Sequence, residues 1–183
     1  VIAALCEGAR TALGFRPRWE RIRASPALIA LLFVLLYLLI IGLERLTIIG
    51  EANFYWRAFL QMGAANFSLI WLVYYLCHSH KEQPSSAQLL TAIWAQDFFL
   101  LFLVTLPGIA LTHAPSQFQK NINWEGPLYY LWFLPMLWMY AVQLLLLWRA
   151  SAKQKAKFSA AAIIYIAAVA FIYYAEPASF WYP

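Results

Sequence analysis

The chain has 183 residues, of which 64% are hydrophobic, 18% aromatic and only 11% charged. Soluble domains carry roughly 25% charged residues, so this composition excludes an ordinary water-soluble domain and indicates a surface that faces lipid. The formal net charge is +5, but the basic residues stand at the ends of apolar stretches. The membrane therefore accounts for them, and nucleic acid is not expected as a partner.

The first segment, residues 1–25, is predicted to be a cytoplasmic interfacial helix followed by a basic entry to the membrane. A soluble helix that continues from upstream sequence would show the same apolar pattern. The apolar positions on one helical face are Ile2, Leu5, Ala9 and Leu13. The arginines of the basic entry are Arg16, Arg18, Arg21 and Arg23.

The clearest membrane span is 27–43, which contains no charged residue. At about 1.5 Å per helical residue it crosses most of a ~30 Å hydrocarbon layer. Ser25 and Pro26 precede it directly. Serine is a favoured N-cap and proline a favoured first helical residue, so the helix is predicted to begin here.

Four further apolar stretches follow, and the fold class we predict is all-α, a polytopic bundle of about five spans over residues 26–176. Pro107 is expected to kink or break the third span, where neighbouring helices can satisfy the freed backbone groups. Residues 177–183 would begin an extracytoplasmic segment. The later spans are predicted at about 58–76, 88–112, 127–148 and 158–175.

The direction of the bundle follows from its basic residues, because Lys and Arg near spans stay on the cytoplasmic side. Segments 1–25, 77–87 and 149–157 together hold ten Lys and Arg residues, and the alternate segments hold three, Arg45, Arg57 and Lys120. We therefore predict a multi-pass membrane protein with the amino end inside and the carboxyl end outside. Tryptophans near the span ends agree with this; they are Trp19, Trp94 and Trp148 inside and Trp56, Trp124 and Trp181 outside.

Asp97 is the principal candidate site residue, because an acid inside a span is costly unless it is paired or protonated. It is preceded by Gln96, and Asn66 and Gln143 would lie at comparable depth on the neighbouring spans of an antiparallel bundle. One interpretation is a polar relay or ion site. The other is a structural acid that holds three helices together by hydrogen bonds.

The remaining polar groups form no complete catalytic constellation. Cys77, His78 and His80 can each ligate metal, but structural metal sites need four ligands and catalytic ones at least three with defined spacing, so no metal and no cofactor is predicted. No buried base accompanies a buried nucleophile, as nucleophilic catalysis would require. Whether the full-length protein is an enzyme stays open at this point.

The loop before the last span is basic and could contact anionic lipid headgroups on the inner face, although setting the topology would be sufficient reason for its charge. Its candidate residues are Arg149, Lys153, Lys155 and Lys157. The lipid bilayer is thus the expected partner, and any homo- or hetero-oligomer would form through the bundle.

Four local patterns in order resemble one protein family: ARTALGFRP, then RIRASPALIALL, then the basic loop, and then FWYP after the last span. They are similar to the amino-terminal multi-span region of proteobacterial proteins that carry a legumain-like, caspase-fold cysteine peptidase domain. The resemblance implies that the membrane is a bacterial inner membrane. It also implies that the catalytic His and Cys lie in a soluble domain after Pro183, so none is assigned here. A second resemblance, to the Yip family, is carried by the five spans and a last span rich in small residues.

Two functions follow as expectations. The first is an integral membrane domain that anchors and orients a following extracytoplasmic domain, with the legumain-like peptidase as candidate. The alternative is a self-sufficient membrane protein of Yip or transporter type that works through Asp97.

Overall fold

The computed structural model describes residues 1–77, 84–113, 127–151, 155–174 and 180–182. Helices dominate it, with one pair of two-residue strands, so the all-α fold class is confirmed. The elements are α1 (Ile2–Ala12), the 3-10 helix η1 (Trp19–Arg21), α2 (Pro26–Leu46), β1 (Asn53–Phe54), α3 (Trp56–Cys77), α4 (Ser86–Thr112), α6 (Pro127–Ala150), α7 (Lys155–Tyr174) and β2 (Trp181–Tyr182).

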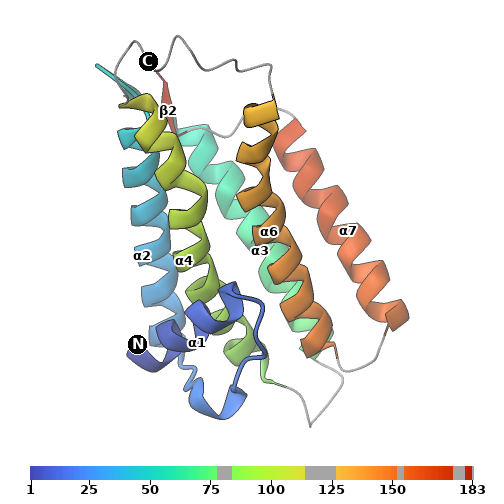
Figure 1. The fold of residues 1–183 in the computed structure, drawn as a ribbon. Coiled ribbons are helices and arrows are strands. Elements are labelled where there is room, and N and C mark those ends of the chain that lie inside the picture. The colour runs from blue at the N-terminus through green and yellow to red at the C-terminus, as the bar shows by residue number, and fades with distance from the viewer. Residues whose placement is uncertain (78–83, 114–126, 152–154, 175–179, 183) are drawn as a thin grey trace.

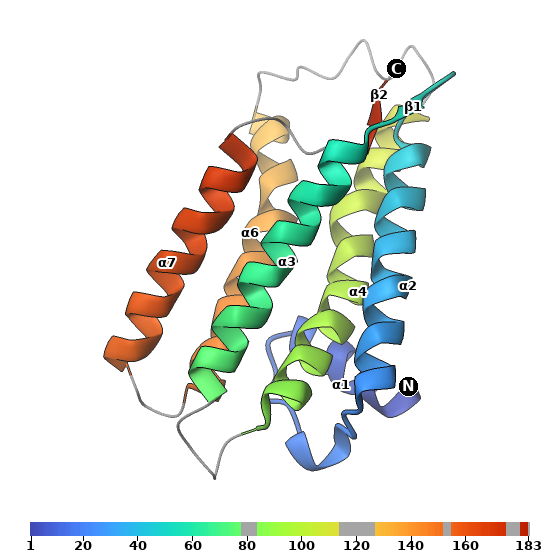
Figure 2. The same cartoon turned by 180° about the vertical axis from the view of Figure 1, so that it is seen from behind.

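The long helices α2, α3, α4, α6 and α7 run alternately up and down, as Figures 1 and 2 show from opposite sides. They begin and end close to the predicted spans. One end of the bundle carries α1 and is called the α1 end. The opposite end carries the β1–β2 pair and is called the sheet end. The alternation places the start of α2 and the end of α6 together at the α1 end.

Three of these helices are long and apolar enough to cross a membrane: Pro26–Leu46, Trp56–Cys77 and Ser86–Pro107. They identify the chain as a membrane protein. In α6 and α7 the apolar segments found among the described residues are shorter, Leu137–Ala150 and Phe158–Ala168. Five spans, and the direction in which they cross, therefore stay predictions.

Local signals in the sequence set two helix features. The Ser25 hydroxyl accepts a hydrogen bond from the Leu28 amide at 3.2 Å, and Pro26 occupies the first turn of α2, so the predicted cap is confirmed. Pro107 lies inside α4, which continues as helix to Thr112. A break at Pro107 was one of two predicted outcomes, and it does not occur.

The core of the bundle is built around α4, which packs against α1, α2, α3 and α6, whereas α7 packs mainly on α3. Leu89, Ala92 and Ile93 of α4 are fully buried. Trp94 is also buried, with its ring centroid 5.1 Å from that of Phe33 on α2. Trp94 thus packs in the core, so its place near a span end does not support the predicted direction.

Helix α1 crosses α4 near the α1 end (Figure 1) and is bound to the bundle along its length. The indole Nε1 of Trp138 donates to the Ala12 carbonyl at 2.9 Å. The Glu7 carboxylate is buried and accepts from the Arg18 backbone amide at 3.1 Å. The predicted amino-terminal helix is confirmed, and its place at the membrane surface stays a prediction.

Candidate functional site

The structure brings together two of the four predicted polar residues of the spans. Gln143 of α6 donates from Nε2 to the Oδ1 atom of Asp97 on α4, at 2.6 Å. The bond joins residues 46 positions apart and links two adjacent antiparallel helices. An acid inside a membrane span loses its hydration, which is costly unless a partner replaces it. The hydrogen bond from Gln143 supplies part of that replacement.

Gln96 lies beside Asp97 in the chain but in a different environment. Its side chain is fully buried, and neither its Oε1 nor its Nε2 atom has a hydrogen-bond partner among the described residues. It is one helical turn from Leu100, which packs with Ala12 of α1 and Val142 of α6. Gln96 is therefore not part of the Asp97–Gln143 pair.

Asn66 makes its hydrogen bonds elsewhere. Its Nδ2 atom donates to the Tyr37 hydroxyl at 3.2 Å and to the Met62 carbonyl at 2.9 Å. The first of these bonds ties α3 to α2. The polar groups of the spans thus form separate interhelical contacts, one between α4 and α6 and one between α2 and α3.

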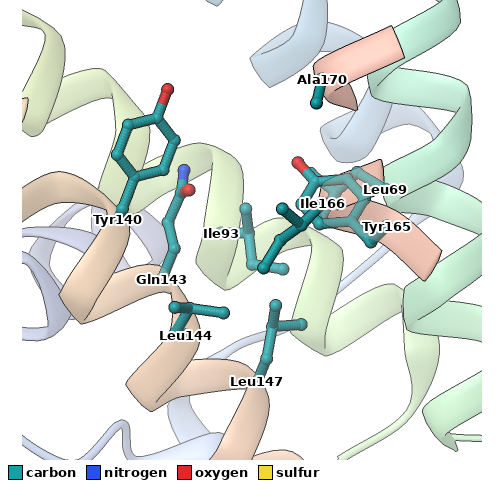
Figure 3. A pocket seen from close by; sticks show the side chains of 9 residues that line it. All are labelled: Leu69, Ile93, Tyr140, Gln143, Leu144, Leu147, Tyr165, Ile166 and Ala170. Carbon is teal, nitrogen blue, oxygen red and sulfur yellow. The ribbon is translucent and has the colours of Figure 1, made fainter. Parts of the chain in front are cut away.

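A cavity of about 470 Å³ lies between α3, α4, α6 and α7, and the side chain of Gln143 forms part of its wall (Figure 3). Leu69, Ile93 and Leu147 are buried and form its floor, whereas Tyr140 and Ile166 are more than half exposed and lie at its mouth. Gln143 thus belongs to the cavity wall and is also the hydrogen-bond partner of Asp97, which is not itself a lining residue. Sequence analysis did not find the cavity, since its walls come from four helices.

The predicted metal and lipid positions are only partly covered. His78 and His80 lie outside the described residues, as does Lys153, and for Lys155 and Lys157 only the backbone is described. Among the described residues, no three His, Cys, Asp or Glu side chains cluster closely enough to hold a metal ion. Arg149 donates one guanidinium hydrogen bond to the Gly14 carbonyl at 3.0 Å. That bond ties the end of α6 to the turn after α1.

A second group of contacts, which sequence analysis missed, fixes residues 180–182 at the sheet end. Strand β2 pairs antiparallel with β1, with Phe54 opposite Trp181. The Phe180 amide donates to Glu44 Oε2 at 2.8 Å, and the indole Nε1 of Trp181 donates to the Ile41 carbonyl at 2.9 Å. We call these residues, Ile41, Glu44, Phe54, Phe180 and Trp181, the aromatic clamp.

The aromatic clamp is well packed as well as hydrogen-bonded. Phe180 is only 2% exposed, and its ring stacks on Phe54 at 5.9 Å between centroids. The Arg45 guanidinium lies 5.8 Å from the centroid of the Trp181 ring, within cation–π range. The signal in the sequence was the run of three aromatic residues from Phe180, together with the acid that ends the first span.

Comparison with known proteins returns no relative: no family model, no curated protein and no solved structure matches the chain.

Proposed function

We propose that this chain is an integral membrane domain that anchors and orients an extracytoplasmic domain following Pro183, with a legumain-like cysteine peptidase as the candidate. The three membrane-spanning helices support the anchoring part of this proposal. The distribution of Lys and Arg supports the direction, with the α1 end inside and the sheet end outside.

The aromatic clamp is the observation that carries the orienting part. A domain joined to a membrane bundle through a loose linker would sample many directions. Here the last described residues are held by a strand pair, by hydrogen bonds to Glu44 and Ile41, and by the burial of Phe180. Whatever follows Tyr182 therefore starts from a fixed point on α2.

Two fusions after Pro183 test the direction. Alkaline phosphatase is active only outside the cytoplasm and green fluorescent protein folds well only inside, so we expect an active phosphatase fusion and a dark fluorescent one. The reverse pattern would refute the proposal.

The orienting role is tested by distance measurements between two spin labels, one at Leu46, an exposed residue at the end of α2, and one on a rigid soluble domain fused after Pro183. Cys6 and Cys77 are first replaced by Ser. We expect a narrow distance distribution in the parent chain and a broad one in Trp181→Ala. The matched control is Trp71→Ala, which removes a partly exposed side chain of α3 that is remote from the clamp in the chain. Its distance distribution should stay narrow. Equal widths in all three proteins would contradict an orienting clamp.

A second candidate function is favoured by the Asp97–Gln143 bond: a self-sufficient bundle of Yip or transporter type that uses Asp97 as a relay or ion position. In liposomes with an imposed potential, such a protein should conduct protons, and Asp97→Asn should abolish the flux while thermal stability is kept. If Asp97→Asn changes only stability, or the parent chain conducts nothing, Asp97 is structural.

A further inference from the structure

The cavity between α3, α4, α6 and α7 is large enough to hold a small molecule. Its volume of about 470 Å³ falls within the roughly 300–1,000 Å³ of small-molecule sites in proteins. It reaches from an exposed mouth at Tyr140 and Ile166 to the buried side chains of Ile93 and Leu147. Since α7 packs mainly on α3, the mouth lies between α6 and α7.

The lining of this cavity selects a neutral, mostly apolar occupant. Its described lining residues are Leu, Ile and Ala side chains together with two tyrosines and Gln143, and none of them carries a charge. A phosphate or carboxylate headgroup would therefore enter without a cationic partner, which is costly away from water. A hydrocarbon chain carries no charge, so it would exchange its contacts with lipid tails for apolar contacts with the cavity wall without this cost.

One polar group in the wall is held in a defined orientation. The Nε2 atom of Gln143 is engaged by Asp97 at 2.6 Å, which leaves the Oε1 atom of the same amide as an acceptor. An acceptor that is oriented in advance favours a ligand that donates a hydrogen bond, because less rotamer entropy is lost on binding. Asp97 thus acts as a positioning residue for Gln143.

From these observations we propose that the cavity binds a lipid-soluble alcohol, a single hydrocarbon chain with a neutral hydroxyl group. The molecule enters sideways from the bilayer between α6 and α7, and its hydroxyl donates to Gln143 Oε1. This site does not depend on the anchoring role, so failure of either proposal leaves the other standing.

Photolabelling of the purified chain in phosphatidylcholine nanodiscs tests the site. The probe is hexadecanol with a diazirine in its chain and a terminal alkyne, and the labelled peptides are mapped. We expect saturable labelling of α6 and α7 that unlabelled hexadecanol suppresses. Labelling that excess hexadecanol does not reduce would overturn the proposal.

Ala170→Trp and Ala167→Trp are the matched variants. The two alanines are both exposed on α7, but only Ala170 lines the cavity. The indole at position 170 should fill the cavity and reduce saturable labelling by about tenfold or more, while the indole at 167 leaves it unchanged. Equal labelling of the two variants would show that the alcohol binds elsewhere.

The role of the hydroxyl is tested separately with Gln143→Leu. Loss of one hydrogen bond in a membrane environment should lower the affinity for the hexadecanol probe by roughly threefold, and affinity for the matching hexadecane probe should not fall. If both probes lose affinity equally, Gln143 does not recognise the hydroxyl. If Gln143→Leu fails to fold, the comparison of positions 170 and 167 still decides whether the cavity is the site.

Discussion

The two sides of α4 are packed in opposite ways. Toward α1 there is no free space: a Cβ atom placed on Gly8 would lie 2.7 Å from the Cβ of Ala95 and would overlap the Ala95 carbonyl group. Toward α6 and α7 there is a cavity of about 470 Å³. The same helix thus has one face in close backbone contact and one that borders open space.

The difference shows two means by which this bundle holds helices together. Membrane helices gain little from the hydrophobic effect and associate instead through close van der Waals packing and interhelical hydrogen bonds. The contact of α4 with α1, which is not one of the spans, is also made by close packing, with Gly8 against Ala95. The α4–α6 contact adds the second, through Asp97 and Gln143. A hydrogen bond can hold a contact beside a cavity, where packing is incomplete.

The largest effect that this comparison predicts is at Gly8. In Gly8→Leu the new side chain meets the backbone of Ala95, which cannot rotate away, so we expect the free energy of unfolding to fall by about 3 kcal/mol. The measurement is unfolding of the purified chain in mixed detergent micelles, followed by circular dichroism. Gly63→Leu is the control, because nothing lies within 4 Å of a Cβ placed there. Similar losses in the two variants would contradict the close α1–α4 contact.

Much of this fold could be predicted from the sequence, because each long helix is an apolar run with a clear start or end. The uncharged run at 27–43 and the Ser25–Pro26 pair located α2, whose cap the structure confirms. The order of the neighbours could not be predicted. A helix that is apolar on every side presents no stripe to show which face meets which partner.

The lack of a distinct face on these helices also limited what could be predicted of the candidate site. Depth in an antiparallel bundle suggested both Asn66 and Gln143 as neighbours of Asp97. Depth says nothing about lateral position, and the structure pairs Asp97 with Gln143 and Asn66 with Tyr37. The Gly8–Ala95 contact and the attachment of Phe180 to Glu44 join segments distant in the chain, with no periodic pattern to indicate them.

An intermediate effect is expected at the hydrogen bond between Asp97 and Gln143, which joins α4 to α6 beside the cavity. A double-mutant cycle on Asp97→Ala and Gln143→Ala should give a coupling energy of about 0.6 kcal/mol and no more than ~1.7 kcal/mol, the range for interhelical hydrogen bonds in membranes. The cycle on Asp97→Ala and Asn66→Ala is the control and should be additive, since Asn66 bonds Tyr37. Both cycles are measured by unfolding in detergent. A coupling near zero in the first would mean that the 2.6 Å contact contributes nothing to stability.

The smallest effect is expected at the cavity between α3, α4, α6 and α7, where a new side chain has room. Ala170 borders the cavity, so Ala170→Trp should place its indole in the opening and change the free energy of unfolding by no more than about 0.5 kcal/mol. Ala161 lies on the same helix but is only 1% exposed within the core. Ala161→Trp must push neighbouring side chains apart, and we expect it to cost about 1–3 kcal/mol. Both variants are unfolded in the same detergent as the parent chain.

If Ala170→Trp is as destabilising as Ala161→Trp, the α6–α7 side is closed in solution, and the contrast between the two faces of α4 disappears. If it is neutral, any loss of hexadecanol labelling in this variant reports a filled cavity and not an unfolded chain.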